Sequence, residues 1–128
     1  MSQQLFERAK YAMSLSYSPY SKFKVGCAVI LKSGNIYIGT NIENSSYAAT
    51  NCAERSAIFN AICADEREFV EMVVISSGEG IIKPCGICLQ VMSEFFDENI
   101  KIHLYNATGK YHTFTLPDLL PIPFKFKI

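Results

Sequence analysis

The chain has 128 residues, and its twelve basic and twelve acidic side chains give a formal net charge of zero. That length suits a single domain spanning residues 1–128, and the 49% hydrophobic content excludes disorder as the default. A nucleic-acid partner is not expected, because proteins that bind phosphate backbones are usually basic. A membrane span is not expected either, since the longest apolar run, residues 25–31, falls well short of ~20 residues. The N-terminus lacks the apolar core of a signal peptide, so secretion is not expected.

The periodicity of apolar residues predicts helices and strands in alternation. Helical spacing predicts helices at residues 2–16, 51–64 and 85–96. Apolar and β-branched runs predict a hairpin of strands at 25–32 and 35–41, and further strands at 71–77, 100–105 and 112–116. Helices that connect strands imply crossovers and a sheet covered on both faces. We therefore expect a three-layer α/β/α sandwich with a mixed five-stranded sheet.

The chain contains five cysteines, an odd number without a preceding signal peptide. A disulfide framework is therefore a poor interpretation, and metal ligation or catalysis is a better one. Two segments contain the candidate metal-ligating and catalytic residues: Cys52-Ala53-Glu54-Arg55, and residues 84–88 with the order Pro-Cys-Gly-Ile-Cys. Each lies where a predicted helix begins.

Cys85 and Cys88 are three residues apart, so their sulfurs share one face of a first helical turn. Free N–H groups and the helix dipole at that end favour thiolate over thiol. If Cys52 opens the neighbouring helix, a third thiolate converges on the same point. Three thiolates match the preference of Zn²⁺ for sulfur in a tetrahedral shell.

A fourth protein ligand would distinguish a structural metal site from a catalytic one. Cys27 lies inside an apolar strand, and Cys63 lies about three helical turns after Cys52. His103 and His112 fall in later strands without ligand-like spacing, so we interpret them as surface or cross-strand residues. Three protein ligands and one open position are the catalytic pattern, and zinc lowers the pKa of a water bound there to ~7.

Two side chains beside the cysteines have competing interpretations. Glu54 can transfer protons next to the metal, or it can simply stabilise the positive end of its helix. Arg55 can offset the negative charge of the thiolates, or it can be a surface residue. The Cys-x-x-Cys pair alone also fits a thiol–disulfide redox site, but that interpretation leaves Cys52 and Glu54 without a role.

The Cys-Ala-Glu and Pro-Cys-x-x-Cys segments together resemble the zinc nucleobase deaminases. Within that group the chain is similar to the small, homotetrameric cytidine deaminases that act on free nucleosides. The resemblance implies one zinc ion per chain on Cys52, Cys85 and Cys88, with Glu54 as the proton carrier. It also implies conversion of cytidine and deoxycytidine to uridine and deoxyuridine with release of ammonia, as in pyrimidine salvage in the cytoplasm.

The same resemblance assigns the substrate contacts. Phe23 would pack against the pyrimidine, Asn41 and Glu43 would hold the 3′-hydroxyl, and Ala53 would also contact the substrate. Without the family, Asn41 and Glu43 read equally well as a solvated strand end. Tyr47 and Phe124 resemble residues that reach into a neighbouring subunit's active site, and alone they would be ordinary packing aromatics.

The chain departs from the family pattern at two places. Leu89 stands where the family usually carries Arg after the last cysteine, which leaves Arg55 with more of the charge compensation. Ile122 and Pro123 replace smaller residues ahead of Phe124. Two alternatives stay open at this point: a deaminase of another aminopyrimidine, such as a nucleoside antibiotic, and a zinc-stabilised binding module without catalysis.

Overall fold

The structure is a computed structural model, and it describes residues 2–126. A five-stranded sheet runs through its centre in the order β2-β1-β3-β4-β5. The strands are β1 (Val25–Leu31), β2 (Ile36–Thr40), β3 (Phe69–Ser76), β4 (Lys101–Tyr105) and β5 (Tyr111–Phe114). Only the β3–β4 pair is parallel; β1–β2, β1–β3 and β4–β5 are antiparallel. The mixed sheet expected from the sequence is confirmed.

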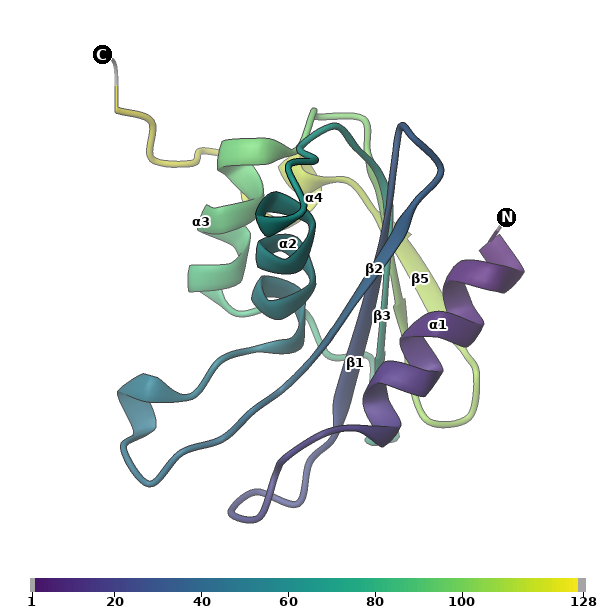
Figure 1. The fold of residues 1–128 in the computed structure, drawn as a ribbon, viewed down its shortest axis with the longest axis vertical. Coiled ribbons are helices and arrows are strands. Elements are labelled where there is room, and N and C mark those ends of the chain that lie inside the picture. Colours follow the sequence, from purple (N-terminus) through teal and green to yellow (C-terminus); the bar gives the residue numbers. More distant parts are fainter. Residues whose placement is uncertain (1, 127–128) are drawn as a thin grey trace.

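One face of the sheet is covered by α1 (Ser2–Ser14), seen beside β1 and β3 in Figure 1. Its apolar face buries Leu5 and Ala9 against Ala28 and Val73 of the sheet. The helix ends at Ser14, two residues earlier than the pattern predicts. After its last turn the chain forms 3-10-type hydrogen bonds between residues three apart, such as the one that the Leu15 amide donates to the Ala12 carbonyl. These bonds tighten the chain before it reaches the turn at Pro19.

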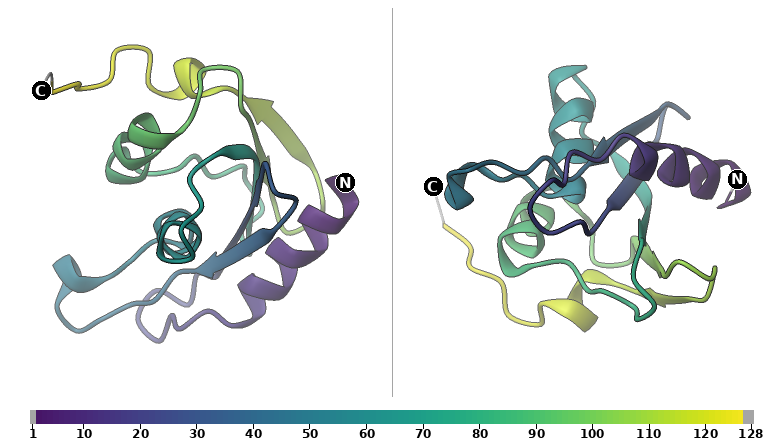
Figure 2. Two further views of the ribbon diagram at one scale, coloured as in Figure 1. Left: turned by 45° about the horizontal axis from the view of Figure 1, so that its top comes forward. Right: turned by 90° about the horizontal axis from the view of Figure 1, so that it is seen from below.

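The opposite face is covered by α2 (Ala53–Cys63), α3 (Gly86–Phe95) and α4 (Leu116–Leu119), as the end-on view in Figure 2 shows. The main core lies between these helices and the sheet. It buries residues from every layer: Ile58, Met72, Val74, Met92, Ile102 and Leu104. Together with α1 on the other face, these helices complete the three-layer sandwich.

The topology brings the first turns of α2 and α3 to the same edge of the sheet. Both β2 and β3 run antiparallel to β1, so they run in the same direction and end at the same edge. Each is followed by a helix that returns over the same face, and α2 and α3 both begin at their lower ends as drawn in Figure 1. A β-carbon on Gly39 would lie 2.2 Å from the Ala57 amide nitrogen, so the glycine permits α2 to seat closely on β2.

Two short elements were not predicted from the sequence: the 3-10 helix η1 (Tyr47–Ala49) and α4. Each is a single turn, too short for the periodicity from which helices are predicted. A reciprocal capping box between Thr115 and Asp118 sets the start of α4. No helix among residues 2–126 is both long and apolar enough to cross a membrane.

Two segments extend away from the sandwich. Figure 1 shows the loop that carries η1 at one end and the C-terminal tail after α4 at the other. The tail returns to α3 at one point, where Gln90 Nε2 donates a hydrogen bond to the Phe124 carbonyl at 3.0 Å. Tyr47 and Phe124 are 84% and 69% exposed, so neither ring packs on the body of the chain that carries it.

Candidate active site

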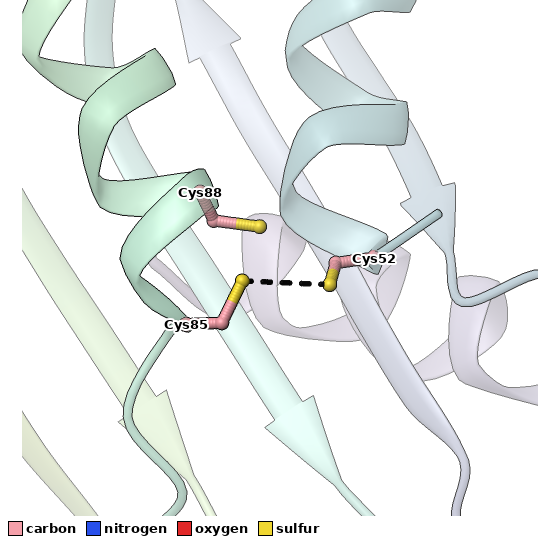
Figure 3. Close-up of side chains that lie close together, drawn as sticks. All are labelled: Cys52, Cys85 and Cys88. Carbon is pink, nitrogen blue, oxygen red and sulfur yellow. Dashed lines mark hydrogen bonds between the residues drawn. The ribbon is translucent and has the colours of Figure 1, made fainter. Parts of the chain in front are cut away.

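The three cysteines predicted as ligands converge between the first turns of two helices. Cys52 is the N-cap of α2, Cys85 is the N-cap of α3, and Cys88 lies in the first turn of α3. Figure 3 shows the three sulfurs turned toward one another. All three lie within 4.8 Å of each other, and the Cys52 and Cys85 sulfurs are 3.8 Å apart. Neither N-cap sulfur caps the backbone of its own helix, so both sulfurs are available to the space between the helices.

The donor set fits a zinc ion. A tetrahedral zinc with Zn–S bonds of ~2.3 Å holds its sulfurs roughly 3.8 Å apart, which matches the Cys52–Cys85 separation. Three sulfur donors also suit zinc better than a hard cation. Within residues 2–126 no other His, Cys, Asp or Glu joins the group, so these residues offer three ligands, the number found in catalytic zinc sites.

The cysteines and histidines set aside as ligands lie elsewhere. Cys27 is buried in the core, and Cys63 is exposed at the far end of α2. His103 contacts Thr113 and Glu71 across neighbouring strands, and His112 is exposed on β5. The expectation that all four are core, surface or cross-strand residues agrees with these positions.

Arg55 bridges two of the sulfurs. Its Nε donates to Cys88 at 3.4 Å, and a terminal nitrogen donates to Cys52 at 3.3 Å. Although partial burial lowers the pKa of Arg55, the hydrogen bonds to the two sulfurs outweigh this and raise it. The guanidinium is therefore directed at the cluster and not at solvent. Leu89, where the family usually has Arg, is buried in the core and supplies no charge.

Cys52 is the sulfur that its surroundings favour as a thiolate. A hydrogen bond from Cys88 is the largest effect on Cys52, and further bonds from Arg55 and Cys85 help to lower the pKa of Cys52 to about 5. The same hydrogen bond raises the pKa of Cys88, because Cys88 keeps the proton that it donates to the Cys52 sulfur. A thiolate cluster stabilised by a cation is the form in which cysteine binds metals.

Glu54 lies beside the cluster in the first turn of α2 and is 6% exposed. Burial, with a smaller contribution from the charge on Cys52, raises the pKa of Glu54 to about 7. A carboxyl group with that pKa accepts and returns a proton near neutral pH. Although Glu54 follows Cys52 by two residues, the two side chains line the same cavity.

A cavity of about 290 Å³ opens in front of the cluster. Phe23, Val25, Val74 and Ile82 make its walls largely apolar. Of the residues predicted to contact substrate, all but Tyr47 and Phe124 line this cavity: Phe23, Asn41, Glu43 and Ala53. Tyr47 borders a separate surface hollow of about 280 Å³ together with Glu43 and Tyr20.

Phe23 is held in place by the loop after β3. A β-carbon on Gly78 would come within 2.9 Å of the Phe23 Cε1 atom, so only glycine lets the backbone lie this close to the ring. The loop therefore forms one side of the cavity and fixes the aromatic wall. Such close backbone packing was not evident from the sequence, where Gly78 reads as a simple loop residue.

Asn41 and Glu43 do more than border the cavity. The Asn41 Oδ1 accepts hydrogen bonds from Ser16 Oγ at 2.6 Å and from the Val25 amide at 3.0 Å, and its Nδ2 donates to the Phe23 carbonyl at 2.8 Å. Glu43 accepts from the amides of Tyr20 and Ser21 and from the Ser21 hydroxyl. The two side chains thereby tie residues 16–25 to the end of β2.

Three thiolates, an adjacent buried carboxylate and a largely apolar cavity are typical of a zinc-dependent hydrolytic enzyme. A family model for the cytidine and deoxycytidylate deaminase zinc-binding region matches residues 1–104. The chain is 43% identical to a cytidine deaminase of Sporosarcina psychrophila over 119 residues, covering 93% of this chain and 88% of the relative. It is 41% identical to a cytidine deaminase of Halalkalibacterium halodurans, covering 93% and 90% of the two chains.

Solved structures of cytidine deaminases share the fold of this chain. The crystal structure of cytidine deaminase from Burkholderia pseudomallei superposes with a TM-score of 0.93 at 41% identity, covering 97% of this chain and 99% of that one. Cytidine deaminase from Mycobacterium tuberculosis superposes with a TM-score of 0.84 at 29% identity and 98% coverage of both chains. The chain belongs to the cytidine and deoxycytidylate deaminase family. It is an enzyme of this type, with zinc as its cofactor.

Proposed function

We propose that this protein deaminates cytidine and deoxycytidine by hydrolysis, producing uridine or deoxyuridine and ammonia. The observation that carries the proposal is the buried Glu54 carboxyl group beside the Cys52, Cys85 and Cys88 sulfurs, in the lining of a cavity sized for a small molecule. We further propose that residues 1–128 act as one catalytic domain. Membership of the family and the similarity to named cytidine deaminases support this assignment.

When bound by the three thiolates, zinc would supply a water molecule acidified toward a pKa of ~7. Glu54 would take one proton from the attacking water and deliver it to N3 of the pyrimidine as oxygen bonds to C4. It would then carry the second proton to the amino group, so that the C4–N bond breaks and neutral ammonia leaves. Burial of Glu54 keeps bulk water from competing for that proton.

Arg55 would hold the charge of the cluster in balance. Three thiolates around Zn²⁺ leave a formal charge of −1, which works against acidification of water. The Arg55 guanidinium donates to two of the sulfurs and withdraws part of that charge. With Leu89 buried and uncharged, this role rests on Arg55 and on the N-termini of α2 and α3.

The sugar would be held by the unused hydrogen-bonding capacity of Asn41 and Glu43. Asn41 has two N–H donors and uses one on the Phe23 carbonyl. Glu43 Oε2 accepts one hydrogen bond, from Ser21, and keeps a further lone pair. One donor and one acceptor remain, which is what a single sugar hydroxyl requires. Phe23 would pack on the pyrimidine, and Ala53, with an unpaired first-turn N–H, would contact its edge.

We propose a homotetramer with shared active sites. Tyr47 and Phe124 lie on the two segments that extend from the body of the chain, and both rings are exposed. An aromatic ring on a projecting arm suits insertion at a partner's cavity, as the family resemblance implies. Sedimentation equilibrium of the zinc-loaded protein tests this, and a monomer at working concentration would contradict it.

A cytoplasmic location is also part of the proposal. The five cysteine thiols are all unpaired in the described structure, and three of them gather at the metal cluster. Free thiols persist in reducing compartments. The substrate would be the pool of free nucleosides in the same compartment, consistent with pyrimidine salvage.

The test is direct conversion followed by chromatography. Purified, zinc-loaded protein is incubated with cytidine and, separately, with deoxycytidine, and uridine, deoxyuridine and ammonia are measured. We expect both products, loss of both on chelation, and recovery when zinc is restored. Absence of product from folded, zinc-loaded protein would contradict the proposal and favour a different aminopyrimidine or a binding role.

A further inference from the structure

Ser76, the last residue of β3, carries a buried hydroxyl without a hydrogen-bond partner. The residue is 2% exposed, and its Oγ is the one buried side-chain nitrogen or oxygen among residues 2–126 that lacks a hydrogen-bond partner. Its neighbour Ser77 differs, because the Ser77 Oγ accepts a hydrogen bond from the Lys24 amide at 2.9 Å. Buried hydroxyls normally have partners, so an unpartnered one at a cavity points to a ligand.

The hydroxyl lies at the cavity in front of the cysteine cluster. Side chains alternate along a strand, and Val74 of β3 faces the core under α2 and α3, so Ser76 faces the same side. Ser76 and Val74 both line the cavity, together with Glu54 and Cys85. Gly78 lies close by, since a β-carbon built on it would be in ordinary van der Waals contact with the Ser76 Oγ, at 3.9 Å.

The sheet places Ser76 opposite the sugar contacts. Ser76 pairs with Val25 of β1, and the Val25 carbonyl accepts a hydrogen bond from the Asn41 amide at the end of β2. These three residues therefore form one row across the sheet, with Asn41 at one end and Ser76 at the other. Two strand spacings separate the ends by roughly 9–10 Å. Asn41 and Ser76 line the same cavity, so a ligand whose sugar lies on Asn41 can reach Ser76.

The chemistry of the pyrimidine decides which group arrives there. The sugar is attached at N1, and C4 lies directly across the ring from N1. With the sugar at Asn41 and C4 at the cluster, the group at the far end is the amino substituent on C4. An amino group offers two N–H donors, and a serine hydroxyl has the free lone pairs to accept one.

We propose that Ser76 is a specificity-determining residue that accepts a hydrogen bond from the 4-amino group of the pyrimidine substrate. The inference rests on the proposed function, since it assumes a 4-aminopyrimidine nucleoside in this cavity. The bond orients the amino group and holds it at the Ser76 side of the cavity as the C4–N bond breaks. Among the residues predicted from the sequence, only Glu54 is assigned to the amino group, and there it carries a proton.

The experiment compares Ser76→Ala with Ser77→Ala as the matched control and Ser76→Thr as the variant that keeps the hydroxyl. Steady-state kinetics with cytidine are measured for each zinc-loaded protein. Inhibition by the ribonucleoside of pyrimidin-2-one is measured in parallel, because that compound has the sugar and the 2-oxo group but no 4-amino group. Thermal unfolding is recorded for all variants.

We expect Ser76→Ala to raise KM for cytidine and lower kcat/KM roughly three- to tenfold, the effect of one neutral hydrogen bond. Inhibition by the pyrimidin-2-one ribonucleoside stays as in the parent protein. Ser76→Thr recovers most of the efficiency, and Ser77→Ala behaves like the parent. The unfolding temperature of Ser76→Ala is not lowered, because the hydroxyl has no bond within the protein to lose.

Three outcomes would overturn the inference. Unchanged kinetics in Ser76→Ala would remove the hydroxyl from substrate binding. Equal weakening of cytidine and of the pyrimidin-2-one ribonucleoside would place the contact on another part of the ligand. A lowered unfolding temperature with unchanged inhibition and KM would make the hydroxyl structural. If the parent protein forms no uridine at all, the proposed function fails first, and that failure is distinguishable from all three.

Discussion

The two ends of the cavity are built on opposite principles. At the cluster end, Cys52, Cys85 and Cys88 bring three sulfurs together, and Arg55 is the cation that contacts two of them. At the sugar end, Asn41 and Glu43 are already bonded to the backbone and side chains of residues 16–25.

The two ends of the cavity are therefore ordered by different interactions. The cluster end needs an ion, because closely spaced thiolates repel one another until a cation joins them. The sugar end is held by the chain itself, and ligand binding there uses only the capacity left over. Changes at the cluster should therefore affect metal and turnover, whereas changes at the sugar end should affect stability and substrate affinity together.

The largest effect is expected for Glu54→Gln. The amide keeps the size of the side chain but cannot carry a proton, and positioned proton transfer contributes ~10²–10⁴-fold to rate. Turnover of cytidine should fall by at least ~10²-fold while zinc content and unfolding temperature stay close to those of the parent. Metal analysis and steady-state kinetics on one preparation check this. Near-normal turnover with full zinc would remove Glu54 from the chemistry.

Arg55→Ala should act next most strongly, and it should act through the metal. Hydrogen bonds to charged groups contribute about 1.5–3 kcal/mol, so zinc affinity should weaken roughly 10- to 150-fold. Competition with a chromogenic chelator measures this affinity, and activity should return when excess zinc is supplied. Arg67→Ala, an exposed arginine remote from the cluster, serves as the matched control. Unchanged zinc affinity and turnover in Arg55→Ala would contradict the bridging role.

The same contrast explains what sequence reasoning could reach. The three cysteines were predictable, because Cys52, Cys85 and Cys88 follow from helical spacing and the chemistry of helix N-termini. The orientation of Arg55 was also within reach, since Cys52 and Arg55 are three residues apart and so share a helix face. Local spacing carries this information without knowledge of the chain path.

The sugar end and Ser76 depend on that path. The bonds from Asn41 to Ser16 and Phe23 join residues 18 to 25 positions apart, and no periodicity encodes them. In the sequence Ser76 is an ordinary strand residue, and only the fold shows that its hydroxyl is buried without a partner. The single-turn elements η1 and α4 were missed for a related reason, because one turn is too short to show a period.

Asn41→Ala should destabilise the fold more than a variant that affects substrate alone. It removes the side-chain partner of the Val25 amide and of the Phe23 carbonyl and one acceptor of the Ser16 hydroxyl, and partly buried groups left unbonded cost about 1–3 kcal/mol. Urea unfolding of the zinc-loaded protein measures this, and KM for cytidine should rise in the same variant.

Asn60→Ala is the control for this change, because Asn60 makes one side-chain bond to the Ile38 carbonyl on the exposed side of α2. It should cost less than Asn41→Ala and leave KM unchanged. Equal stability losses in the two variants would mean that the Asn41 bonds do not order residues 16–25.

The smallest effect is a pH dependence at the sugar end. Hydrogen bonds from Ser21, the largest cause, together with the Tyr20 amide, hold the pKa of Glu43 below its ordinary value of 4.5. Bonds from Asn35, Ser33 and Tyr37 do the same for Glu66, far from the cavity. A carboxyl group whose folded pKa is depressed stabilises the fold above its unfolded pKa, and that contribution is lost as pH falls through the folded value.

Stability should therefore decline between about pH 5 and about pH 3, and each of Glu43→Gln and Glu66→Gln should flatten part of that decline. Urea midpoints measured across this range check the sign. Only Glu43→Gln should also raise KM for cytidine at neutral pH, because only Glu43 borders the cavity. If both variants kept the parent's pH dependence, the hydrogen bonds to these carboxylates would contribute nothing to folding. If Glu66→Gln alone flattened it, the Ser21 and Tyr20 bonds would form only with substrate, and the sugar end would be ordered by its ligand after all.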